Sequence, residues 1–67
     1  MRTERWFLAS NEQATFVFCV DVDGRVSKVA PMGRQWMLGH ALSEVQAQLR
    51  RNHYRLQRLA ADPQIWS

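Results

Sequence analysis

The sequence predicts a small α+β domain, in which helices cover one face of an antiparallel sheet. Two apolar segments on either side of an Asp-Gly pair are typical of a β-hairpin. A capping sequence followed by regularly spaced leucines indicates a long helix near the C-terminus. A length of 67 residues suits one domain, which we expect at residues 1–62, followed by a C-terminal tail at 63–67.

The sheet is expected to be a three-stranded antiparallel meander with strands at 5–10, 15–22 and 25–30. The first segment is short and rich in aromatic residues, and a polar segment suited to a loop follows it. In the second segment nearly every residue is aromatic or β-branched, which favours a strand. The third segment returns after the Asp-Gly pair and ends before Pro31.

The hairpin turn also predicts a register for the second and third strands. A two-residue turn at Asp23-Gly24 places Val22 opposite Arg25 and, by continuation, Val20 opposite Ser27. Because side chains alternate along a strand, one face then carries the apolar residues Phe16, Phe18, Val20 and Val22. The other face carries Val17, Cys19, Val26 and Ala30.

Two helices are expected after the hairpin, a short one at 32–38 and a long one at 43–61. Pro31 suits the first turn of the short helix, and Gly39 suits its end. The residues Ser43-Glu44-Val45-Gln46 match a capping box, and Asp62-Pro63 would stop the long helix. The long helix would measure roughly 27 Å and would therefore extend beyond the sheet.

The apolar positions of the long helix suggest both packing on the sheet and a homodimer. Their spacing describes a helix on a sheet, and it also describes a short heptad seam with a polar residue at its centre. We favour the first interpretation, with the overhanging part as the self-association surface. That surface consists of Asn52, Leu56 and Leu59. The apolar second face of the sheet is a further reason to expect a homodimer.

Positive charge is concentrated near the C-terminus. The chain has nine basic and six acidic residues and a net charge of +3. Four arginines and one aspartate follow Leu49, so the net charge lies in this part. On a continuous helix, Arg51, Arg55 and Arg58 would line one face. Arginine favours bidentate contacts to carboxylates and phosphates.

This arginine-rich surface predicts a binding function. A protein with an acidic surface is the expected partner, because arginine, tyrosine and tryptophan are typical of protein-binding hot spots. Nucleic acid is the alternative, since the same arginines can contact phosphates and a tyrosine can stack on bases. The expected partner-binding residues are Arg50, Arg51, Tyr54, Arg55, Arg58 and Trp66.

The sequence predicts neither an enzyme nor a metal or cofactor site. Cys19, His40 and His53 are too far apart for the usual spacing of metal ligands. The residues Asp21-Val22-Asp23-Gly24 resemble part of an EF-hand loop, but the flanking ligand positions do not match. No apolar run approaches the roughly 18 residues of a membrane span, so no membrane partner is expected.

The central part of the chain resembles a pattern in small uncharacterised phage and prophage proteins. The pattern combines a hydrophobic strand, an Asp-Gly turn, a Val-x-x-Ala-Ala-Pro strand end, an Arg-x-x-x-x-Gly segment and a helix. The matching residues are Ala14 to Pro31, with Val29 replacing the first alanine, then Arg34, Gly39 and an apolar helix, so the resemblance covers Ala14 to Leu49. The resemblance implies an accessory protein of the host cytoplasm. Such proteins often bind and inhibit a host protein, including components of defence systems.

Overall fold

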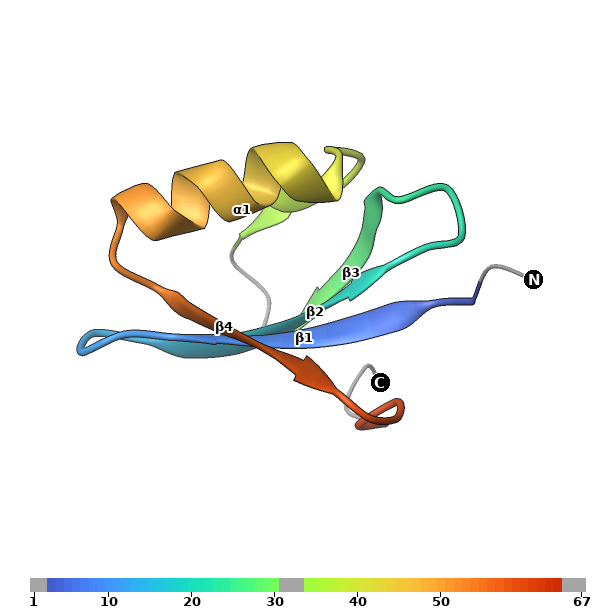
Figure 1. Cartoon of the computed structure of the whole chain (residues 1–67), viewed down its shortest axis with the longest axis horizontal. Coiled ribbons are helices and arrows are strands. Elements are labelled where there is room, and N and C mark those ends of the chain that lie inside the picture. The colour runs from blue at the N-terminus through green and yellow to red at the C-terminus, as the bar shows by residue number, and fades with distance from the viewer. Residues whose placement is uncertain (1–2, 31–33, 65–67) are drawn as a thin grey trace.

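The computed structural model describes residues 3–30 and 34–64 and shows four antiparallel strands with one α-helix across one face of the sheet (Figure 1). The elements are β1 (Arg5–Ser10), β2 (Thr15–Val20), β3 (Val26–Ala30), a 3-10 turn η1 (Gln35–Met37), α1 (Leu42–Arg51) and β4 (Arg55–Leu59). The strand order is β3-β2-β1-β4, so β4 pairs with β1 at the edge of the sheet. The chain has a small α+β fold, but the expectation of three strands is wrong.

The largest difference from the sequence prediction is the end of α1, which stops at Arg51 and not near residue 61. The amide of Tyr54 donates to the Leu49 carbonyl at 3.0 Å, and the amide of His53 donates to the Arg50 carbonyl at 3.0 Å. His53 has a φ of 62°, in the left-handed region. These bonds form a Schellman motif, which closes the helix and turns the chain into β4.

The early end of α1 removes the expected helical overhang. Leu56 and Leu59 lie on β4, and Asn52 follows the last helical residue, with its side-chain amide donating to the Gln48 carbonyl at 3.0 Å. Arg55 and Arg58 also lie on β4, so they do not share a helix face with Arg51. The prediction of one continuous apolar and one continuous basic stripe is therefore wrong.

The left-handed backbone at His53 gives a prediction that distinguishes a Schellman motif from a continuous helix. A left-handed conformation costs a residue with a Cβ about 1–2 kcal/mol, which glycine avoids. Glycine also loses more conformational entropy on folding than histidine, which offsets part of this gain in stability. We therefore expect His53→Gly to raise the melting temperature by roughly 2–8 °C. Thermal unfolding followed by circular dichroism measures this shift.

Asn52→Gly provides the matched control, because Asn52 has a φ of −96° and gains nothing from glycine. It also loses its side-chain bond to Gln48, so this variant should be less stable than the parent. A lower melting temperature for His53→Gly would contradict the Schellman ending, since glycine inside a helix is destabilising by about 1 kcal/mol relative to alanine.

Among the described residues between the hairpin and α1, 34–41, the structure has the 3-10 turn η1, so the expected helix at 32–38 is wrong over its described part. Residues 32 and 33 of that prediction lie outside the described residues. Met37 is fully buried beneath α1, and Gly39 donates its amide to the Val26 carbonyl at 2.8 Å. The segment therefore crosses the edge of β3 and closes the core on that side.

The hairpin between β2 and β3 has a longer loop than expected. The Asp21 amide donates to the Arg25 carbonyl at 2.8 Å, and Gly24 has a φ of 82°. This geometry corresponds to a three-residue loop, Val22 to Gly24, closed by a glycine in the left-handed region. The Asp21 carboxylate accepts from the amides of Asp23 and Arg25 at 2.9 and 3.0 Å. Val22 therefore lies in the loop, 47% exposed, and not on the core face of the sheet.

The register confirms half of the predicted hairpin and corrects the rest. Phe18 pairs with Val29 and Cys19 with Lys28, which are the pairs that continue the predicted register, but Val20 pairs with Val26 and not with Ser27. Ser27 is therefore the extra residue of a β-bulge. The bulge turns Val26 to the face of Val20, where it is 2% exposed, and removes it from the outer face.

The core lies between α1 and the inner face of the sheet. Phe7 and Phe18 stack with ring centroids 5.3 Å apart, and Phe16 lies 6.2 Å from Phe18. Val45 and Leu49 of α1 cover these rings. The outer face has no helix over it within the described residues, and its apolar side chains there are buried or half-buried. They are Trp6, Leu8, Val17, Cys19, Ala30 and Leu59.

Candidate anion-binding groove beside β4

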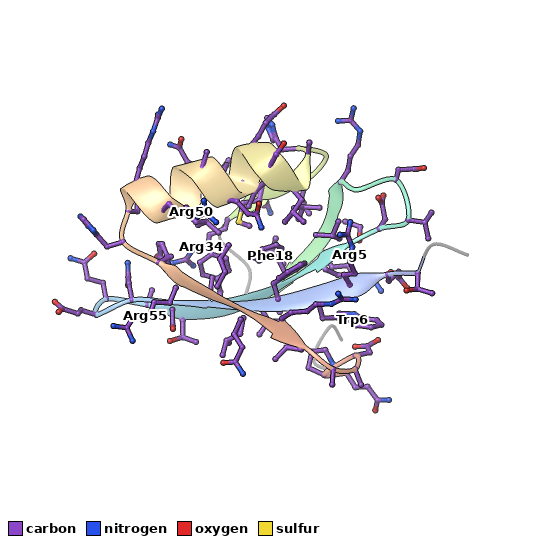
Figure 2. All side chains as sticks on the ribbon, viewed as in Figure 1. Arg5, Trp6, Phe18, Arg34, Arg50 and Arg55 are labelled. Atoms are coloured by element: carbon purple, nitrogen blue, oxygen red, sulfur yellow. The ribbon has the colours of Figure 1, made fainter. Side chains whose placement is uncertain are left out.

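A polar groove lies where the connection between α1 and β4 meets the turn between β1 and β2. Its volume is about 770 Å³. The residues that line it are Ser10, Asn11, Glu12, Gln13, Arg51, Asn52, His53 and Arg55. Arg55 lies beside the β1–β2 turn at one end of the sheet, and Arg5 and Trp6 lie toward the other end (Figure 2). The groove therefore joins segments that are about 40 residues apart in sequence.

Asn11 holds the two walls of the groove together. Its side-chain amide donates to the Asn52 carbonyl at 3.1 Å, across the groove. Its side-chain oxygen accepts from the amides of Gln13 and Ala14 at 2.8 and 2.9 Å, which is an Asx turn. Every hydrogen-bonding atom of this side chain thus supports either the turn or the contact with the helix end. The spacing between the walls is therefore largely set before any ligand binds.

The charges of the groove favour an anionic ligand. Arg51 and Arg55 are exposed and contribute two permanent positive charges, whereas Glu12 is the one acidic residue in the lining. The guanidinium groups can each form paired hydrogen bonds with a carboxylate or a phosphate.

The predicted partner-binding residues are divided among several places. Arg51 and Arg55 lie in the groove, and Arg50 is exposed on the last turn of α1 but does not line the groove. Arg58 lines a smaller groove, of about 340 Å³, at the opposite end of β4 together with Arg5 and Glu4. Trp66 lies outside the described residues. The predicted arginine cluster is thus distributed along β4 and the end of α1.

Tyr54 is half-buried and packs against the core. Its ring meets the Phe16 ring edge-on with centroids 5.3 Å apart. The Arg34 guanidinium lies 4.3 Å from the centroid of Phe16 and donates to the Tyr54 hydroxyl at 3.2 Å. The two contacts hold the half-buried ring in place. Tyr54 is therefore not a free platform for a nucleic-acid base.

Several residues of this surface were missed by the sequence analysis. Asn11 and Gln13 lie in a segment interpreted only as a loop, and His53 was assigned to a helix. The signal for the loop residues was an Asn within the polar tetrapeptide Ser10-Asn11-Glu12-Gln13, and Asn is common in turns. The sequence alone does not show that this turn meets the end of α1, because that contact depends on the position of β4.

Cys19 is fully buried, and its surroundings disfavour the reactive thiolate form. Burial raises the pKa of Cys19 above its usual value, and the hydrogen bond to the Glu4 carboxylate, 3.3 Å from the sulfur, acts in the same direction. The Ser27 side chain acts against these effects, but burial is the largest cause. The thiol therefore remains protonated at neutral pH.

We expect Cys19 to resist iodoacetamide at pH 8 in the folded protein and to react readily in 6 M guanidinium chloride. Because the pKa of Cys19 is higher in the folded state, this thiol should not affect the free energy of unfolding at neutral pH. That free energy should fall as the pH rises above the usual thiol value of about 9, because the thiol of the unfolded chain then ionises first. Mass spectrometry after timed alkylation measures the reactivity. Equal rates in the folded and denatured protein would contradict the burial of this side chain.

Within residues 3–30 and 34–64, no three His, Cys, Asp or Glu side chains are grouped so as to hold a metal ion. No helix in the described part of the chain is long and apolar enough to cross a membrane. No protein-family model matches the sequence, and no curated protein or solved structure is significantly similar to it.

Proposed function

We propose that this chain is a phage-type accessory protein that binds an acidic surface of a host protein and inhibits it. The observation that supports the proposal most is the groove in which Arg51 and Arg55 face the same polar space. Two arginines in one preorganised groove suit carboxylate groups on a partner. The resemblance of the hairpin to phage and prophage proteins supports the mobile-element part of the proposal.

An acidic protein is a better candidate than nucleic acid. A nucleic-acid site of this size would combine phosphate contacts with an aromatic surface for base stacking. The aromatic residue nearest to the arginines in sequence, Tyr54, packs against Phe16 and bonds to Arg34. The net charge of +3 is also small for a protein whose affinity depends on phosphate contacts. Nucleic acid therefore remains an outcome of the test.

Charge reversal in the groove should abolish capture of the partner. We expect Arg55→Glu to reduce recovery of the host protein from a nuclease-treated bacterial lysate by at least tenfold, about 1.4 kcal/mol of binding free energy. Arg50→Glu is the matched control, because it makes the same change in net charge on an exposed arginine outside the groove. Quantitative mass spectrometry of the captured proteins provides the measurement.

Equal losses for the two variants would contradict a specific role for the groove. Binding of random duplex DNA at micromolar affinity would support the nucleic-acid alternative, with a log–log salt slope of about −0.9 for each phosphate contacted. Affinity for DNA no tighter than millimolar at low salt would exclude that alternative. Inhibition is then tested by adding the protein to an activity assay of the captured host protein.

A further inference from the structure

The outer edge of β4 offers backbone groups to a partner. β4 pairs with β1 through all five of its residues and is the last strand in the order of the sheet. Within the part of the chain that the structure describes, no strand pairs with its other edge. In an antiparallel strand, alternate residues direct their N–H and C=O groups away from the neighbouring strand. Such an edge is a template for one more strand.

The side chains of β4 place a positive charge on each face of this edge. Leu56 lies opposite Ala9 and packs against the core, so Arg58 also belongs to the inner face. Arg55, Gln57 and Leu59 belong to the outer face. Both arginines are exposed, and Leu56 and Leu59 are half-buried. An added strand would therefore meet one arginine and one leucine on each face.

These charges argue against a second copy of the chain at this edge. A two-fold pairing of β4 with itself, centred on Gln57, would place Arg58 opposite Leu56 of the copy. The two copies of Arg58 would then be diagonal neighbours on one face, with Cβ atoms within roughly 7–8 Å. Like charges at this separation repel each other, which disfavours this pairing. An acidic strand would instead pair each arginine with a carboxylate.

We propose that β4 is the docking edge for an extended acidic segment of the partner, which joins the sheet as a fifth, antiparallel strand. The proposal rests on the proposed function, because it specifies how the acidic protein is recognised. Because the added strand runs antiparallel to β4, its successive residues lie opposite Leu59, Arg58, Gln57, Leu56 and Arg55. We expect apolar residues opposite the two leucines, acids opposite the two arginines and a polar residue opposite the glutamine. The motif is thus apolar–acidic–polar–apolar–acidic.

A capped peptide with the central sequence Val-Glu-Thr-Val-Glu is the probe. We expect it to shift the amide resonances of β4 in ¹⁵N NMR spectra and to bind with a dissociation constant below 1 mM. In the added strand, every second residue of the peptide directs its backbone N–H to β4, so methylating these nitrogens should weaken binding at least tenfold. Methylating the nitrogens of the intervening residues should have little effect, because their N–H groups point to solvent.

Charge exchange tests the pairing of side chains. The Arg55→Glu/Arg58→Glu protein should lose the acidic peptide and bind Val-Lys-Thr-Val-Lys, which the parent should not bind. Circular dichroism shows whether the doubly substituted protein is folded, and the parent protein with the methylated peptides provides a test that needs no substitution.

The outcomes separate this inference from the proposed function. If the acidic peptide does not bind, or binds equally well whichever amides are methylated, the added strand is wrong. The groove can still hold an acidic surface, as the Arg55→Glu and Arg50→Glu lysate experiment decides. If both variants capture the partner equally while the peptide adds to β4, the proposed function is wrong and the edge interaction stands. A dimer at micromolar concentration that Arg58→Glu alters would assign the edge to a second copy and overturn the proposal.

Discussion

Phe18→Ala should destabilise the protein by about 3–5 kcal/mol. Phe18 is 0% exposed and lies between the sheet and α1 (Figure 2). Its ring stacks on Phe7 and lies close to Phe16. Removing a buried phenylalanine side chain costs about 3–5 kcal/mol, since the apolar surface is lost and the cavity collapses only in part. A domain of this length has a net stability of roughly 3–10 kcal/mol, so one substitution removes a large share of it.

Urea denaturation followed by circular dichroism measures the loss. Val22→Ala is the control, because Val22 is 47% exposed in the hairpin loop and its truncation should change stability by less than about 0.5 kcal/mol. Similar midpoints for Phe18→Ala and the parent would show that the ring is not in the core. A loss from Val22→Ala as large as that from Phe18→Ala would place Val22 on the core face, as a two-residue turn requires.

Strand β2 and its buried face could be predicted because the sequence features that indicate them are local. Thr15 to Val20 is rich in aromatic and β-branched residues, and period-two alternation identifies Phe16 and Phe18 as neighbours on the buried face. The glycine of the turn was also located correctly. The loop length was wrong because Asp21, and not Val22, closes the loop, with its carboxylate accepting from two backbone amides.

The fourth strand could not be predicted because its sequence fits both a helix and a strand. The spacing of Leu49, Leu56 and Leu59 matches a heptad, but it also results when a helix ends and a strand follows. The decisive feature is His53, whose left-handed backbone ends α1 without the glycine that usually marks such a site. Pairing with β1 then stabilises the strand, and this contact spans almost the whole chain.

The arginines of the candidate site were identified from composition, but their arrangement was not. Charge statistics locate Arg51, Arg55 and Arg58 near the C-terminus, whereas their positions depend on the course of the backbone. On a helix they would form one stripe, and on β4 Arg55 and Arg58 point to opposite faces. An acidic partner would therefore meet Arg55 and Arg58 on different faces of β4, and this is why we propose an extended segment as the docked part of the partner.

Deleting Ser27 should be tolerated, whereas deleting Val17 should unfold the protein. Ser27 is the extra residue of the bulge, between Val26 opposite Val20 and Lys28 opposite Cys19. Its removal leaves Val26, Lys28, Val29 and Ala30 in strict alternation, with the two valines still facing the core. We expect a change in stability of no more than about 1 kcal/mol, including the loss of the bond from the Ser27 hydroxyl to the Cys19 carbonyl at 3.4 Å.

Val17 offers the opposite case, because its segment of β2 has no extra residue. Without Val17, Phe16 and Phe18 become adjacent and must lie on opposite faces of the sheet, so one ring leaves the core. The expected loss is at least the 3–5 kcal/mol of a buried phenylalanine. Circular dichroism and thermal unfolding of the two deletion variants measure the difference. Without a bulge, and with a two-residue turn, deleting Ser27 would also move the side chains of part of β3 to the opposite face of the sheet. Unfolding of that variant would therefore contradict the bulge.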